Sequence, residues 1–215
     1  MLPSHVLYLH GFRSSPMSTK ARYLAAWFAQ HYPLAKWHCP ALPVSPKEAA
    51  RLIQHTMQAW PRASTLVIGS SLGGFYATWA AAQHACAGVL LNPAVHPARD
   101  LSRYVGVHPT WHDPTQSIEV KPTHIEEMKA LYVGEGLSHA ATVDAEGWMG
   151  LPDARHLLAV IAKGDEVLDW QEMASRYTGA TRHVIEGSDH GISDFADHVH
   201  VLENFIRQLP EDTAC

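Results

Sequence analysis

One short segment of the chain combines a reactive residue type with the surroundings that catalysis needs. Gly-Ser-Ser-Leu-Gly at residues 69–73 matches the pattern G-x-S-x-G and has Ser71 at its centre. An apolar run precedes the segment and an alanine-rich helical pattern follows it, so a strand, a sharp turn and a helix are expected. In such a nucleophile elbow the glycines remove Cβ atoms that would collide with neighbouring backbone. The sequence therefore predicts that Ser71 is a nucleophile.

A serine hydroxyl reacts only when a base takes its proton, and the base needs a third group that fixes its tautomer. Asp165 follows the apolar run at residues 157–162, and His190 follows the apolar run at residues 182–185. The order Ser, then Asp or Glu, then His is that of the α/β-hydrolases, in which each residue lies on a loop after a strand. We therefore predict a catalytic triad of Ser71, Asp165 and His190.

Three nearby acidic residues compete with Asp165 for the third position. Asp169 directly precedes a helical pattern and is better explained as the N-cap of that helix. Glu166 is expected to point to solvent. Asp189 adjoins the predicted base and could orient it, although a role in forming the turn is the simpler interpretation.

The tetrahedral intermediate of acyl transfer also requires two backbone N–H donors aimed at its oxyanion. The residue after the nucleophile, Leu72, supplies the first donor. The second is expected from Phe12, in a His-Gly-Phe turn directly after the apolar run at residues 5–9. Gly11 lets this turn bend toward the site, and His10 is interpreted as a brace for the loop.

The elements that must position these residues follow from the hydrophobic pattern. Strand-like runs occupy residues 5–9, 36–39, 65–68, 87–91, 157–162 and 182–185. Helical patterns occupy residues 18–31, 45–60, 71–84, 170–177 and 194–209. This alternation predicts the α/β class, with a mostly parallel sheet of about six strands and helices on both faces. Right-handed crossovers then bring the loops after successive strands to one edge, where α/β folds bind ligands.

One connection is too long for a simple crossover. About 65 residues separate the runs ending at residue 91 and beginning at residue 157, against about 30 in a typical βαβ unit. We expect a small cap or lid within about residues 95–150, with a short helix that Thr123 caps and Glu126 supports as a capping box. A surface excursion without a catalytic role is the alternative. Trp111, Trp148 and Met149 are candidates to set the length of the substrate pocket.

Composition limits the other classes of function. A chain of 215 residues favours a single domain. The net charge of −5, without a run of Lys or Arg, gives no footprint for nucleic acid or an acidic membrane surface. No apolar stretch is long enough to span a bilayer and no secretory signal is visible, so a cytoplasmic protein is expected. The three cysteines fit reduced thiols, and the 16 histidines lack metal-ligand spacing, so neither metal nor cofactor is predicted.

Several segments together resemble the YqiA/YcfP-like family of small bacterial α/β-hydrolase-fold esterases. They are residues 9–16 with Ser18 and Lys20, residues 69–74, residues 91–94, residues 164–169 and residues 189–190. The resemblance implies a minimal α/β-hydrolase without leading antiparallel strands, a triad at Ser71, Asp165 and His190, and hydrolysis of carboxylic or thio esters. The segment 137–152 is longer than the family suggests, and His190 is followed by Gly191 and Ile192.

The leading hypothesis is a serine esterase that hydrolyses small-molecule carboxylic esters of small acyl groups through an acyl-enzyme. An acyl-CoA thioesterase would use the same residues and differ only in its leaving group. A non-catalytic protein that uses a hydrolase-like fold for binding is the second alternative. No sequence feature predicts an oligomeric state.

Overall fold

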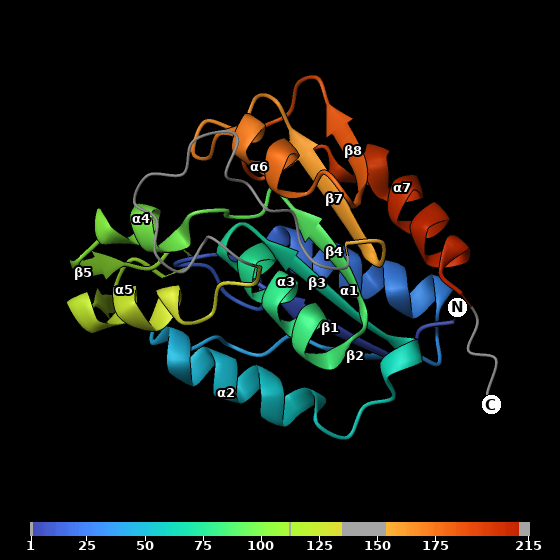
Figure 1. Ribbon diagram of the computed structural model, residues 1–215, viewed down its shortest axis with the longest axis horizontal. Coiled ribbons are helices and arrows are strands. Elements are labelled where there is room, and N and C mark those ends of the chain that lie inside the picture. Colours follow the sequence, from blue (N-terminus) through green and yellow to red (C-terminus); the bar gives the residue numbers. More distant parts are fainter. Residues whose placement is uncertain (1, 112, 135–153, 211–215) are drawn as a thin grey trace.

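A computed structural model of the protein describes residues 2–111, 113–134 and 154–210. Within these residues six strands form one sheet, in the spatial order β2-β1-β3-β4-β7-β8 (Figure 1). They are β1 (His5–Leu9), β2 (Lys36–His38), β3 (Thr65–Ser70), β4 (Ala87–Leu91), β7 (Leu157–Ala162) and β8 (Thr181–Ile185). Every neighbouring pair is parallel. The predicted α/β class and the parallel sheet are therefore confirmed.

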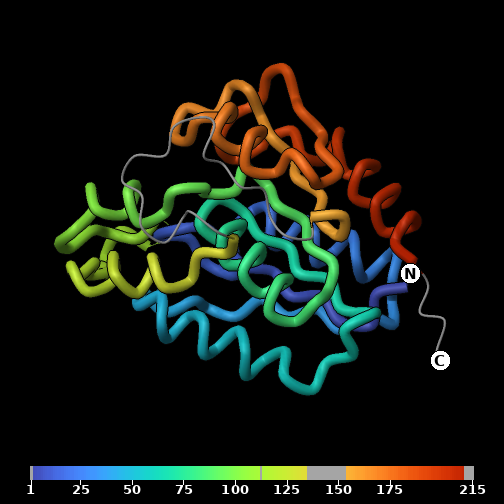
Figure 2. The backbone as a smooth tube through the Cα atoms, viewed as in Figure 1, coloured from blue at the N-terminus to red at the C-terminus, as the bar shows by residue number. Residues whose placement is uncertain are grey.

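Helices cover both faces of the sheet (Figure 2). The helices α1 (Thr19–His31) and α7 (Phe195–Gln208) pack on one face. On the opposite face lie α2 (Pro46–Met57), α3 (Leu72–His84) and α6 (Trp170–Arg176), and a short 3₁₀ turn, Arg62–Ser64, precedes β3. Among the described residues no helix has both the length and the apolar character needed to cross a membrane.

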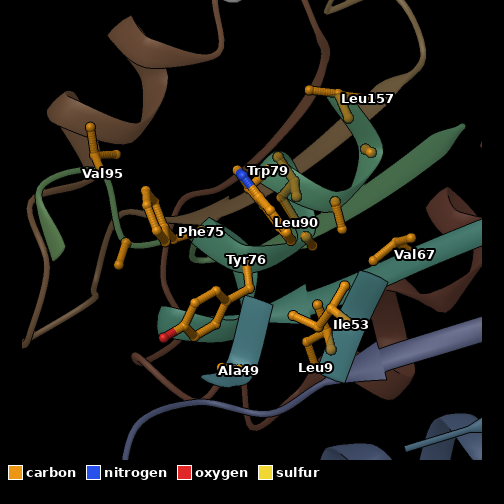
Figure 3. Packing of buried hydrophobic residues seen from close by; sticks show 14 of the residues in the cluster. Leu9, Ala49, Ile53, Val67, Phe75, Tyr76, Trp79, Leu90, Val95 and Leu157 are labelled. Atoms are coloured by element: carbon orange, nitrogen blue, oxygen red, sulfur yellow. The ribbon is translucent and has the colours of Figure 1, made fainter. Parts of the chain in front are cut away.

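The apolar strands are explained by this double cover. Successive side chains of a strand point to opposite faces, so a strand between two helical layers is apolar at every position. In β1, Val6 and Tyr8 pack against α1 and α7, whereas Leu7 and Leu9 pack against α2 and α3. Figure 3 shows the second of these layers, where Ile53 and other side chains of the flanking helices meet the sheet. Because the strands between these layers are parallel, the loops that follow them emerge at one edge of the sheet.

An insertion between β4 and β7 lies at one end of the molecule, at the left in Figure 1. It contains α4 (Pro97–Ser102), the antiparallel pair β5 (Gly106–Pro109) and β6 (Ser117–Val120), and α5 (Pro122–Lys129). The prediction that Thr123 is the N-cap of this helix was wrong, because the helix begins at Pro122 and Lys121 is its N-cap. Proline is well suited to the first helical position, since its fixed φ is already helical and its missing N–H would have had no acceptor there.

Polar contacts attach the insertion to the rest of the fold, and two carboxylates take part in them. Arg99 of α4 donates to both carboxylate oxygens of Glu172 in α6, at 2.6 and 2.8 Å. Glu127 of α5 accepts from the Ser45 hydroxyl at 2.7 Å and from the Lys47 N–H at 3.2 Å, at the start of α2. These contacts hold the insertion beside the carboxyl ends of the strands.

Candidate active site

Ser71 lies in the turn between β3 and α3, in a conformation that non-glycine residues rarely adopt. Its φ is 56° and its ψ is −122°, a conformation that costs about 1–3 kcal/mol. Four backbone hydrogen bonds hold it: its N–H donates to the Leu91 carbonyl at 3.0 Å, and its carbonyl accepts from the N–H groups of Gly74 at 2.9 Å, Ala94 at 3.0 Å and Phe75 at 3.4 Å. The sharp turn exposes the hydroxyl at the end of the sheet.

The flanking glycines are required by the closeness of the backbone at this turn. A Cβ atom at Gly69 would lie 2.0 Å from the Gly73 carbonyl oxygen, and a Cβ atom at Gly73 would lie 1.9 Å from the Leu9 carbonyl oxygen. Both distances are far inside van der Waals contact with atoms that cannot move aside. The turn can therefore form only when both positions are glycine.

The structure brings the three predicted triad residues into one hydrogen-bonded row. His190 Nε2 lies 2.9 Å from the Ser71 hydroxyl, and His190 Nδ1 lies 2.8 Å and 3.0 Å from the two Asp165 carboxylate oxygens. A carboxylate can only accept, so the imidazole donates through Nδ1–H and its Nε2 is left to accept the serine proton. The Asp165 side chain is 0% exposed and that of His190 is 22% exposed, so of these two residues only the base faces the solvent.

Asp165 is fixed by the loop that carries it. Its Oδ1 accepts from the N–H groups of Val167 and Leu168, both at 2.8 Å. Asp169, the alternative acid, caps α6 by accepting from the Gln171 N–H at 2.8 Å, as the sequence indicated. These two aspartates, four residues apart, therefore have different roles, and of the two only Asp165 contacts the histidine.

The loop around His190 has two further acidic contacts. Asp189 accepts from both the N–H and the hydroxyl of Ser193, at 2.9 and 2.6 Å, as a turn-forming residue does. These hydrogen bonds lower the pKa of Asp189. Glu166 is exposed as expected, yet its carboxylate also accepts the His190 backbone N–H at 2.9 Å. That contact was not predictable from the sequence, because the two residues are 24 positions apart along the chain.

The loop after β1 lies against the serine. A Cβ atom at Gly11 would approach the Ser71 Cβ to 3.3 Å and the Ser70 carbonyl oxygen to 3.4 Å, so glycine allows the close approach. His10 is buried, accepts the Leu42 N–H on Nε2 at 3.1 Å, and therefore carries its proton on Nδ1, which lies 3.0 Å from the Gly11 carbonyl. Phe12 follows in this loop and Leu72 is the first residue of α3, so both lie in backbone segments that adjoin Ser71.

Asn92, directly after β4, connects the strand ends in a way that sequence reasoning missed. It is fully buried with a φ of 43°, and its Oδ1 accepts the Ala162 N–H at 2.8 Å. That bond fixes the amide orientation, so Nδ2 donates to the carbonyls of Asp189 and His190, both at 3.1 Å. One side chain thus ties the end of β7 to the loop that carries the base. An Asn after an apolar strand was the only signal for it.

A cavity of about 840 Å³ opens above Ser71, a volume within the range of small-molecule sites. One wall is apolar and comes from the loop after β1, the elbow and the insertion. Its lining residues are Phe12, Leu72, Ala94, Pro97, Leu101 and Tyr104. Trp111 also lines the cavity and stacks beneath the Arg13 guanidinium, 4.0 Å from its ring centre. The other two candidates for pocket length, Trp148 and Met149, lie outside the described residues.

The opposite wall is more polar and comes from the start of α1 and the loop after His190. Its lining residues include Ser18, Thr19, Lys20, Tyr23, Gly191, Ile192 and Ser193. Lys20 stands out because its Nζ is buried and has no hydrogen-bond partner among the residues that the structure describes. Burial lowers the pKa of its ammonium to about 8, although the Asp189 and Asp165 carboxylates oppose the change. The sequence showed a lysine near the start of a helix but nothing of its burial.

With this geometry in view, comparison with known proteins is informative. The model of the uncharacterised protein family UPF0227 matches residues 5–207, nearly the whole chain. The chain belongs to this family. UPF0227 is the YqiA/YcfP family, so the resemblance noted in the sequence is confirmed.

Solved structures with the same fold are distant in sequence. Est1E from Butyrivibrio proteoclasticus, in a structure with bound ferulic acid, aligns with a TM-score of 0.68 at 12% identity, over 96% of this chain and 89% of that one. Mouse alpha/beta hydrolase domain-containing protein 10 aligns with a TM-score of 0.66 at 12% identity, over 96% and 90%. A monoacylglycerol lipase from Paleococcus ferrophilus gives 0.64 at 14% identity, over 95% of each chain. At such low identities these structural alignments establish the α/β-hydrolase fold alone.

Proposed function

We propose that the protein is a serine esterase that hydrolyses carboxylic esters of small acyl groups through an acyl-enzyme intermediate. The observation that carries the proposal is the row of hydrogen bonds from the Ser71 hydroxyl through His190 to the buried Asp165 carboxylate. The nucleophile lies within hydrogen-bond distance of the base, and the base lies within hydrogen-bond distance of the orienting acid, as nucleophilic catalysis requires. The esterases and lipases among proteins of this fold add support for hydrolysis of an ester.

In the proposed reaction the Ser71 Oγ attacks the carbonyl carbon of the ester while His190 Nε2 takes the hydroxyl proton. The tetrahedral intermediate then collapses, the bond from carbon to the alcohol oxygen breaks, and His190 gives its proton to the departing alkoxide. Water attacks the resulting acyl-Ser71 ester by the same path in reverse and releases the carboxylic acid. Asp165 stays ionised throughout and stabilises the imidazolium that forms twice in each cycle.

The backbone N–H groups of Phe12 and Leu72 are proposed to stabilise the oxyanion. Both come from segments that adjoin Ser71, and the first turn of α3 adds the partial positive charge of a helix N-terminus. Loss of one such donor typically raises the barrier by about 3 kcal/mol. The apolar wall of the cavity is proposed to hold the acyl group. In this wall Leu72 follows Ser71 in the chain, and the Ala94 N–H donates to the Ser71 carbonyl.

The test is hydrolysis of p-nitrophenyl esters from acetate to palmitate by the wild type and by Ser71→Ala. We expect turnover of the short esters, and a loss of kcat of about a millionfold in Ser71→Ala, because the nucleophile is removed. Ser175→Ala, an exposed serine of α6, is the matched control and should retain full activity.

A covalent probe separates the esterase from a binding protein. A fluorophosphonate should add to Ser71 of the wild type, as an increase in intact mass, and should not add to Ser71→Ala. An absence of both turnover and labelling would overturn the proposal. Higher kcat/KM for an acyl-CoA than for the matched acyl ester would instead identify a thioesterase.

A further inference from the structure

We propose that Lys20 and the N-terminus of α1 form an anion-binding subsite, so that the preferred esters carry a carboxylate or phosphate group on their alcohol part. This inference deepens the proposed esterase function, and the statement that the ligand is an ester rests on that function. Its observations are separate from the triad: a buried lysine without a hydrogen-bond partner, a helix N-terminus beside it, and a cavity that both of them line.

The state of the lysine is the first observation. Buried ammonium groups are normally paired, because removing an unpaired charge from water costs several kcal/mol. The Nζ of Lys20 has no hydrogen-bond partner among the described residues. The nearest carboxylates act on it only at a distance, since Asp165 is engaged by His190 and Asp189 by Ser193. The residues that the structure describes therefore leave all three donors of this ammonium unused.

The position of the lysine in its helix is the second observation. Lys20 is the second residue of α1, a helix of 13 residues whose N-cap is Ser18. The first N–H groups of a helix have no acceptor within it and carry partial positive charge, which favours an anion at that end. The Ser18 hydroxyl accepts from the Ala21 N–H at 3.3 Å and so satisfies one N–H of this first turn. Two cationic features thus converge on one wall of the cavity.

The side of the cavity assigns the anion to the alcohol part. His190 must give its proton to the departing alkoxide, so the leaving group lies beside the imidazole. Lys20 is on that side, because the two carboxylates that act on its ammonium adjoin the base. Asp165 is hydrogen-bonded to His190, and Asp189 directly precedes His190 in the chain. Ile192 and Tyr23 line the same wall and are apolar surfaces for the body of the leaving group. The lysine side chain has four rotatable bonds, so a small rotation presents the ammonium to a ligand.

Of the other titratable groups near Lys20, His190 becomes positive only while it holds a transferred proton in the proposed reaction, and the rest are acidic or neutral. Asp165 and Asp189 are the carboxylates that act on its ammonium, and the pKa of Asp189 is lowered by its bonds to Ser193. Burial raises the pKa of the Tyr8 hydroxyl, which lines the same cavity, so it remains neutral. Near neutral pH Lys20 is the cation that an incoming anion meets on this wall.

Matched substrates test the proposal with the full-length protein. They are 4-(butanoyloxy)benzoate, 4-(butanoyloxy)phenyl phosphate and the neutral 4-(butanoyloxy)benzamide, each corrected for its rate of hydrolysis by hydroxide. The quantity measured is kcat/KM for each anionic ester divided by kcat/KM for the neutral one. In Lys20→Met this ratio should fall by about tenfold or more, as expected for the loss of a hydrogen bond to a charged group. Comparison of the two anionic esters identifies carboxylate or phosphate as the preferred group.

Two variants control for charge. Lys20→Arg keeps the cation and should restore much of the ratio. Arg22→Met removes one positive charge from the exposed face of the same helix and should change the ratio by less than about twofold, because exposed charges are screened. An unchanged ratio in Lys20→Met, with hydrolysis that still depends on Ser71, would overturn the subsite and leave the esterase intact.

Binding without catalysis keeps the two proposals distinguishable. Benzoate, phenyl phosphate and benzamide are titrated into wild type and Lys20→Met by calorimetry. One of the two anions should bind the wild type at least about tenfold more tightly than benzamide and lose that advantage in the variant. This result would support the subsite even if no ester were hydrolysed. Equal affinity of the wild type for all three probes would overturn it.

Discussion

Replacement of Asn92 tests quantitatively how hydrogen bonds between strand ends and loops position the base. Its amide joins three backbone groups: the N–H of Ala162 at the end of β7, and the carbonyls of Asp189 and His190 in the loop that carries the base. It does so from a positive φ of 43°, which asparagine tolerates better than most residues other than glycine. Replacement therefore perturbs the hydrogen bonds and the backbone separately, and two variants resolve the two contributions.

Asn92→Gly removes the amide but keeps a residue that adopts positive φ freely. Three hydrogen bonds at about 1 kcal/mol each predict a loss of about 3 kcal/mol in the free energy of unfolding. Asn92→Ala also has to adopt positive φ with a Cβ atom, so it should lose about 1 kcal/mol more. Because the His190 carbonyl is one of the anchored groups, kcat should fall in both variants, by about ten- to a hundredfold.

The assay is urea unfolding followed by tryptophan fluorescence, together with ester hydrolysis. Asn204→Ala, on the exposed side of α7, is the control and should stay within about 0.5 kcal/mol of the wild type. If Asn92→Gly were as stable as the wild type, the three hydrogen bonds would not contribute as argued. If it lost stability with an unchanged kcat, Asn92 would stabilise the fold without positioning the base.

Three further predictions concern substitutions of single residues. Asp165→Asn should lower kcat by about ten-thousandfold, because the amide no longer fixes the tautomer of the base, whereas Asp169→Asn should leave kcat near the wild-type value; similar kinetics of the two variants would contradict the assignment. Gly69→Ala should fail to fold, because its Cβ would lie 2.0 Å from a backbone oxygen, whereas Gly187→Ala, with nothing within 4 Å, should fold; circular dichroism and gel filtration distinguish the two. Lys20→Met should raise the free energy of unfolding by up to about 3 kcal/mol at pH 7, since burial lowers the pKa of this ammonium from 10.5 to about 8. The unfolded chain binds more protons than the folded one between these values, so the wild type gains stability as pH rises from about 8 to 10.5 and the difference from Lys20→Met should shrink; a variant less stable than the wild type would show that Lys20 is a structural ion-pair partner.

The regular elements were predictable because burial on both faces leaves a plain pattern in the sequence. The strands β1, β4 and β7 have the predicted bounds, since each is an apolar run that ends where the chain leaves the core. The chain order of serine, aspartate and histidine then placed the three residues in loops at one edge of a parallel sheet. Helix ends were less regular. Pro122 begins α5 one residue before the predicted cap, because proline at the first helical position outweighs the capping box.

The insertion and the contacts between loops were not predictable in the same way. The short elements α4, β5 and β6 carry too few residues for a clear periodicity. The contact of Glu166 with the His190 backbone depends on the packing of two loops that are 24 residues apart. The burial of the Lys20 Nζ is likewise a property of the folded chain that the residue type does not indicate. Residue type alone gives no information on such partners.

Two features at this edge of the sheet oppose the stability of the fold, and they differ in what relieves them. The strain at Ser71 is held by four backbone hydrogen bonds, and no ligand is needed to maintain it. The buried charge of Lys20 has no such support among the described residues, so only an anion, or deprotonation, lowers its cost. A ligand that pairs with this ammonium should therefore stabilise the fold by more than its contact area implies, and Lys20→Met should remove that excess. The two costs are thus of different kinds: the strain at Ser71 exposes the hydroxyl whether or not a substrate is present, whereas the charge of Lys20 favours a substrate that brings its own negative charge.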